Sequence, residues 1–398
     1  MKKITATTLG LLSVSSLCAQ SLFDLAPKDG ETESSPLFWT VGASLGYDDN
    51  PTPGSDNETA YGVVYVGAAF LSQSPQTTVE FAGRLGYVHY FDDLDFGLLK
   101  VDQSTPTGSL RLNLTHRVSE RLRLSSRNSL AFEYQPDYSV GSSAIRQTGA
   151  YTRWSTDNSV GYRWSERLGT YTGFIYDGVD YDNPLAQRND ISAITLYNDF
   201  RYQLSPQTVA TLTYRYADRN TTVSDTQNHF IMAGGEHRFS SNSVAIVRAG
   251  VQLRSIDGST RDYTSPSAEA AVTTRVNQQL SVKAYGRLST EDSSRQIGAA
   301  VYDNANTMRL GVTGTYRVSQ ALSLSSGINY LSLAYEDGTT TTADDVDESL
   351  INAFVGFDLQ IAENLYLNGS YNFEDLSSDE DTREYDRNRM SIGVRATF

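Results

Sequence analysis

The last ten residues read Arg-Met-Ser-Ile-Gly-Val-Arg-Ala-Thr-Phe, from Arg389 to Phe398. Apolar residues occupy every second position of this stretch, and polar or small residues lie between them. Because successive side chains of a β-strand point to opposite faces, the alternation predicts a strand with one apolar and one polar face. The strand ends on an aromatic residue, Phe398.

The same alternation surrounds a short motif that recurs along the chain. Each copy has an aromatic or aliphatic residue, a small polar residue, about two turn residues and then a new alternating run. A motif of this kind predicts a tight turn between two strands. The eight copies begin at Phe70, Arg117, Arg163, Gln203, Arg238, Arg275, Arg317 and Gln360.

A second class of connection lies between consecutive motifs. It is longer and rich in Asp, Glu, Asn, Gly and Thr, for example after Tyr47, Tyr335 and Phe373. Short turns that alternate with longer loops are typical of bacterial transmembrane barrels. Eight turns and nine loops predict an all-β fold, a transmembrane antiparallel up-and-down β-barrel of 18 strands. A barrel of 16 strands is the alternative if the Gly- and Ala-rich first segment does not form a hairpin.

The N-terminus has the pattern of an export signal: Lys2 and Lys3, an apolar stretch, and small residues around Ala19. We therefore predict a signal peptide over 1–20, a short periplasmic leader over 21–36 and the barrel over 37–398. The first strand is expected near Trp39, paired with the last strand, with both ends in the periplasm. No later apolar run is long enough for a transmembrane helix, so a membrane protein with this sequence must be a barrel.

Aromatic residues gather at the predicted strand ends. Some, such as Tyr47, precede acidic loops, and others, such as Phe70, Trp164 and Phe239, lie near the short turns. This placement matches the aromatic girdles of a membrane barrel. The alternative is that they are ordinary core residues of a soluble sandwich, although nothing in the sequence resembles the edge protection that a sandwich needs.

The net charge of −15 argues against a nucleic-acid partner. In the predicted register many basic residues point inward, while acidic residues concentrate in the outer loops. This predicts a positively lined lumen beneath an acidic mouth. The alternative is that the arginines pair with inward Glu80, Glu133, Asp157, Asp199 and Asp358 and only stiffen the wall. The predicted pore-lining residues are Arg84, Arg111, Arg121, Arg123, Arg127, Arg153, Arg163, Arg201, Arg215, Arg248, Arg254, Lys283, Arg287, Arg309, Arg317 and Arg395.

No catalytic or metal site is predicted. The sequence has no Gly-x-Ser-x-Gly elbow, and His89 and His116 fall in the lipid-facing phase. Cys18 is the only cysteine, and the four histidines lack a metal-binding spacing. We expect no enzyme, no metal and no cofactor; divalent ions would at most bridge the acidic loops to lipopolysaccharide. The outer loops, at about eight to fourteen residues, look too short to fold into the lumen as a constriction.

The signal sequence, the Gly-Tyr-Asp-Asp-Asn phrase at Gly46 to Asn50, the Arg-Val-Ser-x-x-Leu turns and the terminal aromatic resemble the β-barrel porins of Gram-negative bacteria, also called the outer membrane β-barrel protein family. The resemblance implies location in the cell outer membrane. It also implies that Phe398 is an assembly signal for the barrel-assembly machinery, reached with the help of periplasmic chaperones. It carries over no catalytic residue.

We expect a passive channel for small polar solutes, anions among them, with outer-membrane lipid and lipopolysaccharide around it. The alternative is a barrel associated with exopolysaccharide export, or a structural or surface-binding barrel, without general porin activity. The sequence leaves the solute and the oligomeric state open.

Overall fold

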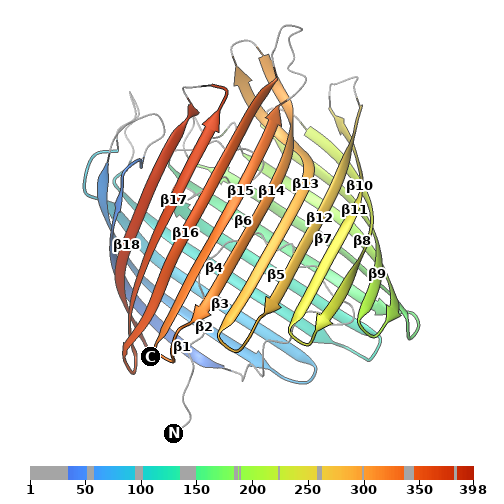
Figure 1. Ribbon diagram of the computed structural model, residues 1–398, viewed down its shortest axis with the longest axis horizontal. Helices are drawn as coiled ribbons and strands as arrows, with labels where there is room; N and C mark the ends of the chain where they lie inside the picture. The colour runs from blue at the N-terminus through green and yellow to red at the C-terminus, as the bar shows by residue number, and fades with distance from the viewer. Residues whose placement is uncertain are drawn as a thin grey trace.

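The computed structural model describes residues 35–51, 58–94, 102–134, 149–182, 187, 190–222, 225–257, 262–297, 300–335, 345–380 and 383–398. The predicted signal peptide, 1–20, and most of the predicted leader, 21–36, lie outside the described residues. The described chain forms one closed sheet of 18 antiparallel strands, tilted around the barrel (Figure 1). The prediction of an 18-strand up-and-down barrel is confirmed, and the 16-strand alternative is wrong.

The strands are β1 (Ser35–Asp48), β2 (Thr59–Gln73), β3 (Thr77–Tyr90), β4 (Ser104–Arg117), β5 (Leu122–Tyr134), β6 (Ala150–Arg163), β7 (Leu168–Tyr181), β8 (Ile191–Ser205), β9 (Thr208–Thr221), β10 (Asp225–Ser240), β11 (Ser243–Ile256), β12 (Asp262–Arg275), β13 (Leu280–Ile297), β14 (Ala300–Arg317), β15 (Leu322–Tyr335), β16 (Val346–Ala362), β17 (Leu365–Ser378) and β18 (Tyr385–Thr397).

The repeated Ser of the sequence motif closes the short turns. The Ser119 hydroxyl accepts a hydrogen bond from the backbone N–H of Leu122, at 3.1 Å, and Ser319 does the same for Leu322, at 3.0 Å. A hydroxyl that binds backbone three residues ahead holds the chain in a tight turn. The motif recurs because the same short turn joins successive pairs of strands at one end of the barrel.

The barrel closes between its first and last strands. The backbone N–H of Trp39 donates to the Phe398 carbonyl oxygen at 3.0 Å, and the Phe398 N–H donates back to the Trp39 carbonyl oxygen at 2.9 Å. Strand β18 pairs with β1 from Thr40 opposite Thr397 to Asp48 opposite Arg389. The expected pairing of the terminal strand with the strand around Trp39 is therefore confirmed.

Large apolar side chains cover the outer surface. Leu45 is 62% exposed, Leu85 69% and Leu196 50%, and similar residues recur on every second position of the strands. Phe239 and Trp164, 67% and 59% exposed, lie at the short-turn end. A continuous apolar surface of this extent is stable only in lipid, so the barrel spans a membrane and the soluble-sandwich alternative is wrong. None of the described residues forms a helix long and apolar enough to cross a membrane.

Inward-facing tyrosine rings lie flat against the wall over glycines. A Cβ atom added to Gly46 would come within 2.3 Å of the Tyr61 ring, and one added to Gly42 would come equally close to Tyr65. The missing side chains let each ring occupy the wall of the neighbouring strand rather than project toward the barrel axis. Glycines at these two positions therefore keep the lumen wide.

Candidate functional site: the luminal wall

The luminal face of β8 to β12, called here the paired wall, carries arginines bound to carboxylates. Arg201 on β8 and Glu236 on β10 form a two-pronged pair, with Nη1 to Oε1 at 2.7 Å and Nη2 to Oε2 at 2.5 Å. Their side chains are 0% and 1% exposed. A buried guanidinium held by both oxygens of a carboxylate has its charge compensated.

Arg248 on β11 extends this pairing across the wall. It lies 2.7 Å from Glu269, 3.5 Å from Glu236 and 3.6 Å from Asp199. Glu269 also accepts hydrogen bonds from Arg215 at 3.0 and 3.2 Å. The arginines and carboxylates of β8 to β12 thus form one connected network along the inner face.

The outer half of the β13–β14 hairpin enters the lumen. Strands β12 and β13 pair only as far as Ala268 opposite Leu288, and β13 continues beyond that point without β12. The Gln252 side chain takes the place of the missing strand, because its amide donates to the Thr290 carbonyl at 2.7 Å and accepts from the Thr290 N–H at 3.0 Å. The outer loops were expected to be too short to form a constriction; here strand residues of a hairpin, and not a loop, enter the lumen.

Ionic contacts fix this hairpin to the inner wall. Asp292 accepts hydrogen bonds from Arg219 at 2.8 Å, from Arg254 at 2.5 Å and from the Thr226 hydroxyl at 2.7 Å. Arg254 also donates to Asn304 at 2.5 Å. All of these partners belong to the luminal face of β9 to β11 or to the hairpin itself, so the hairpin narrows the outer mouth.

The sequence of β13 explains why its outer half leaves the lipid-facing wall. In β13 the outward phase runs through Val282, Ala284 and Leu288, and the next residues in that phase are Thr290 and Asp292. Polar side chains facing hydrocarbon lose their hydrogen bonds at high cost. Inside the lumen they find the partners that lipid would not supply.

The opposite side of the hairpin is apolar. Tyr302 and Ala305 pack with side chains from the inner faces of β15 to β17, and the whole cluster is buried. The hairpin is therefore held by charges on one side and by apolar packing on the other. The strand residues of the cluster are Leu331, Leu333, Tyr335, Val346, Leu350 and Leu376.

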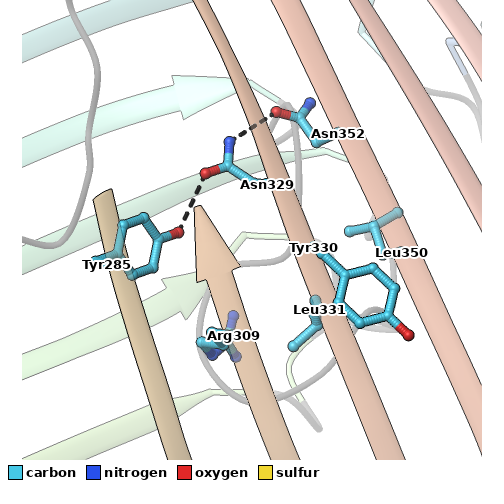
Figure 2. A pocket seen from close by; sticks show the side chains of 7 residues that line it. All are labelled: Tyr285, Arg309, Asn329, Tyr330, Leu331, Leu350 and Asn352. Atoms are coloured by element: carbon cyan, nitrogen blue, oxygen red, sulfur yellow. Dashed lines mark hydrogen bonds between the residues drawn. The ribbon is translucent and has the colours of Figure 1, made fainter. Parts of the chain in front are cut away.

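A chain of polar side chains crosses the wall just below this cluster. Figure 2 shows the Tyr285 hydroxyl donating to Asn329 at 3.2 Å, and Asn329 donating to Asn352, also at 3.2 Å. Arg309 lines the same recess and is bound to Glu291 on the hairpin at 3.0 Å. The recess is small, and the polar groups around it are largely bonded to one another.

The luminal face of β3 to β6, called here the open wall, is different. Arg84, Arg111 and Arg153 make no salt bridge with any residue in the described part of the chain, and all three are partly exposed. The guanidinium of Arg84 lies over the Tyr65 ring, 3.6 Å from its centroid. Arg127 lies 4.0 Å from Asp157, a loose contact at the edge of this wall.

The other predicted lining residues have several environments. Arg121 lies in the turn between β4 and β5, exposed and outside the strands, so its assignment to the wall does not hold. Arg395 is bound to Asp358 at 2.8 Å. Arg163 donates to the Glu166 carbonyl at 3.0 Å. The remainder occupy the inward phase of their strands: Arg123 on β5, Lys283 and Arg287 on β13, and Arg317 on β14.

Of the five carboxylates expected to pair with arginine, three do so: Asp157, Asp199 and Asp358. Glu80 instead accepts from Asn113 at 2.9 Å, and Glu133 accepts from Tyr151 at 2.5 Å. The strongest partners were missed by the sequence reasoning. They are Glu236, Glu269, Glu291 and Asp292, with Asp48, which binds Arg387 at the outer end.

All four histidines lie on the outward face, each bonded to a hydroxyl on the neighbouring strand. His89 contacts Ser104 at 2.6 Å and His116 contacts Thr77 at 2.7 Å. His229 and His237 contact Tyr214 and Thr208 in the same way. Within the described residues, no group of three or more His, Cys, Asp or Glu side chains is placed to hold a metal ion.

No family model and no curated protein matches the sequence. Solved porins are similar over most of the chain at low identity. OpdK of Pseudomonas aeruginosa, solved with vanillate, is 12% identical over 91% of this chain and 99% of its own, with a TM-score of 0.49. A BenF-like porin of Pseudomonas fluorescens Pf-5 is 15% identical over 91% and 98%, with a TM-score of 0.47.

OccK2 of Pseudomonas aeruginosa, solved with glucuronate, is 13% identical over 91% of this chain and 98% of its own, with a TM-score of 0.46. Vanillate and glucuronate are ligands of those two proteins, and their binding says nothing about this chain. The closed barrel with its apolar outer surface is itself the architecture of bacterial outer-membrane proteins, and it places the chain in that membrane.

Proposed function

We propose that the protein is an outer-membrane channel through which small polar solutes diffuse, with a preference for anions. The observation that carries this proposal is the open wall, where Arg84, Arg111 and Arg153 face the lumen and form no salt bridge with any described residue. Uncompensated charge on a pore wall raises the local concentration of ions of the opposite sign.

The paired wall contributes little to this preference, because its guanidiniums and carboxylates cancel one another at short range. The inward hairpin limits the size of the solute, since it occupies part of the outer mouth. No step of this function requires catalysis, and the four histidines all face away from the lumen.

The test is the reversal potential of the purified protein in planar bilayers under a KCl gradient. We expect reproducible conductance steps with anion preference, and glucuronate or vanillate as competing anions should reduce the chloride current. The variant Arg84→Gln/Arg111→Gln/Arg153→Gln should lose most of the preference. A matched variant of the paired wall, Arg201→Met/Glu236→Leu, should keep it. Cation preference in the wild type would contradict the proposal.

The exopolysaccharide-export alternative gains no support from the aromatic residues near the outer end. Tyr61, Tyr90 and Tyr134 form a row with ring centroids 5.6 and 5.5 Å apart, but these residues are only 5%, 1% and 7% exposed, so their rings offer no platform for a sugar ring. A channel that stays silent alone and conducts only with partner proteins would favour this alternative.

We further propose that Phe398 acts as an assembly signal for the barrel-assembly machinery, after export by the N-terminal signal and transit with periplasmic chaperones. Its ring is 71% exposed on the lipid side, so a receptor can reach it. Deletion of Phe398 should lower the amount of heat-modifiable, folded barrel in outer-membrane fractions. An unchanged amount would contradict the assignment.

A further inference from the structure

Polar side chains interrupt the apolar outer surface on β5 to β8. They occupy the outward phase of their strands, in which Leu124, Leu130 and Val160 are also exposed. Unlike the outer half of β13, these strands keep both neighbours in the sheet at this level, so the side chains stay on the outer surface. These residues, called here the polar band, are Ser126, Asn128, Thr156, Asn158, Thr172 and Asn198.

Four members of the polar band form a closed ring of hydrogen bonds between β5 and β6. The Ser126 hydroxyl donates to Asn158 at 2.7 Å, and the Asn158 amide donates to Thr156, also at 2.7 Å. The Thr156 hydroxyl donates to Asn128 at 2.7 Å, and the Asn128 amide donates back to Ser126 at 3.0 Å. The hydroxyl and amide groups are therefore held in fixed positions on the outer surface.

The ring does not use all of the hydrogen-bonding groups on this face. An Asn amide has two N–H donors and an oxygen with two lone pairs. Within the described part of the chain, Asn158 gives one donor and one lone pair to the ring and makes no other side-chain hydrogen bond. Beside the ring, the Asn198 amide donates to Thr172 at 2.5 Å, and Thr172 is exposed. The polar band therefore keeps donors and acceptors for a partner that lies against it.

The polar band lies in the middle of the hydrocarbon layer. Its members are four to seven residues from the short turns, since Ser126 follows Leu122, the first residue of β5, by four positions and Thr156 precedes Arg163, the last residue of β6, by seven. A tilted strand climbs about 2.5 Å per residue along the membrane normal, which places the band about 10–18 Å above the turns in an apolar belt about 25 Å tall. At this depth a lipid offers only its acyl chains, which form no hydrogen bonds.

The rest of the wall does not repeat the polar band. At the same distance from the short turns, the outward residues of the other described strands are apolar, aromatic or glycine, apart from Ser326 on β15. Leu110 and Leu112 occupy this level on β4, and Leu310 and Val312 occupy it on β14. Polar groups that face hydrocarbon cost free energy. This cost is concentrated on four adjacent strands of the 18, which sets one face of the barrel apart.

We propose that a second copy of this chain covers the polar band, in a two-fold dimer whose axis runs along the membrane normal. The band has no charged member and carries donors and acceptors together, so it is complementary to itself, and a two-fold rotation brings the amides of one copy to those of the other. Four tilted strands present roughly 600 Å² of wall within the apolar belt before side chains add to it, and a stable interface buries roughly 800 Å² on each partner. The dimer does not depend on the channel function proposed above.

The experiment is cysteine cross-linking of the full-length protein in isolated outer membranes. Phe174 is 41% exposed and lies opposite Asn158 in the register, at the centre of the polar band. We expect Phe174→Cys, treated with a short bis-maleimide, to give a product of twice the monomer mass. The matched control is Ile328→Cys, which is 52% exposed on β15, on the opposite side of the barrel (Figure 1). This control should stay monomeric, and so should the wild type, whose one cysteine is Cys18.

A further variant tests whether the polar side chains cause the association. Asn128→Leu/Asn158→Leu, made together with Phe174→Cys, should lower the cross-linked fraction about tenfold, which corresponds to about 1.4 kcal/mol. Heat-modifiable mobility on gels checks that this variant still forms the barrel. Ser326→Leu in the same background should leave the fraction unchanged.

Four results would overturn the proposal. They are no cross-linking at Phe174, equal cross-linking at Phe174 and Ile328, a product that contains a different protein, and an unchanged cross-linked fraction in the folded leucine variant. None of these results bears on conductance in planar bilayers, so a failure of the dimer is distinguishable from a failure of the channel.

Discussion

Arginine has different roles on the paired wall and on the open wall. On β8 to β12, arginine is buried and shared among Asp199, Glu236 and Glu269, so it holds strands together. On β3 to β6, Arg84, Arg111 and Arg153 are partly exposed and form no salt bridge within the part of the chain that the structure describes. An inward-facing arginine therefore does not by itself mark a solute path, because the groups around its guanidinium decide whether its charge acts on a solute.

The largest effect is expected where a pair is broken on the paired wall. Glu236→Gln leaves Arg201 buried with an uncompensated charge, and losing one partner of a buried ion pair costs about 3–5 kcal/mol. Urea unfolding in phospholipid vesicles, followed by tryptophan fluorescence, measures the loss. Arg201→Met/Glu236→Leu, which removes both charges, should recover most of it. A double variant as unstable as the single one would show that the pair does not account for the effect.

The second prediction concerns the hairpin that the paired wall holds in place. Asp292→Asn weakens its contacts with Arg219 and Arg254, and hydrogen bonds to charged groups contribute about 1.5–3 kcal/mol each. We expect a larger single-channel conductance and faster proteolysis between Thr290 and Asn304. Asp375→Asn, on the outward face of β17, is the matched control. Unchanged conductance and proteolysis would mean that Asp292 does not hold the hairpin.

A smaller effect is expected on the open wall. Arg84→Gln/Arg111→Gln/Arg153→Gln removes one cation–π contact and no salt bridge, so the free energy of unfolding should fall by less than about 1 kcal/mol. The same urea titration measures it. A loss as large as that of Glu236→Gln would erase the distinction between the two walls.

The smallest effect belongs to the contact at the edge of the open wall. Arg127 and Asp157 are 4.0 Å apart and 35% and 20% exposed. A double-mutant cycle with Arg127→Gln and Asp157→Asn should give a coupling energy below about 1 kcal/mol, screened further in 1 M KCl. A coupling energy of several kcal/mol would show that this ion pair is as strong as the buried ion pairs of the paired wall.

The strand phase, the turns and the closing pair were predictable because each depends on local pattern. The alternation from Met390 to Phe398 identifies one face of the strand directly. The repeated Ser accepts a backbone hydrogen bond three residues ahead in three turns and two residues ahead in the turns of Ser205 and Ser240. The partners of the arginines were not predictable in this way. Arg201 and Glu236 lie 35 residues apart on strands that are not neighbours, so their contact depends on the register of β9 between them.

The sequence contains a pattern that indicates the inward hairpin, but an argument from loop length alone does not detect it. Thr290 and Asp292 continue the lipid-facing phase of Leu288, and Asn304 and Asn306 continue that of Met308. Polar residues in a lipid-facing phase indicate that a strand has left the lipid. The strand residues themselves form the constriction, so a search limited to long loops could not find it.

The bond between Trp39 and Phe398 also bears on the kinetics of folding. Trp39 and Phe398 are 359 positions apart in the sequence (398 − 39), so sheet closure joins strands with the greatest sequence separation in the barrel. Contacts of this separation form slowly, and until they form, β1 presents a free edge that can pair with other chains. The wall can therefore close only after β18 is available, so the order of synthesis makes the β1–β18 seam the last pairing whose two strands both exist.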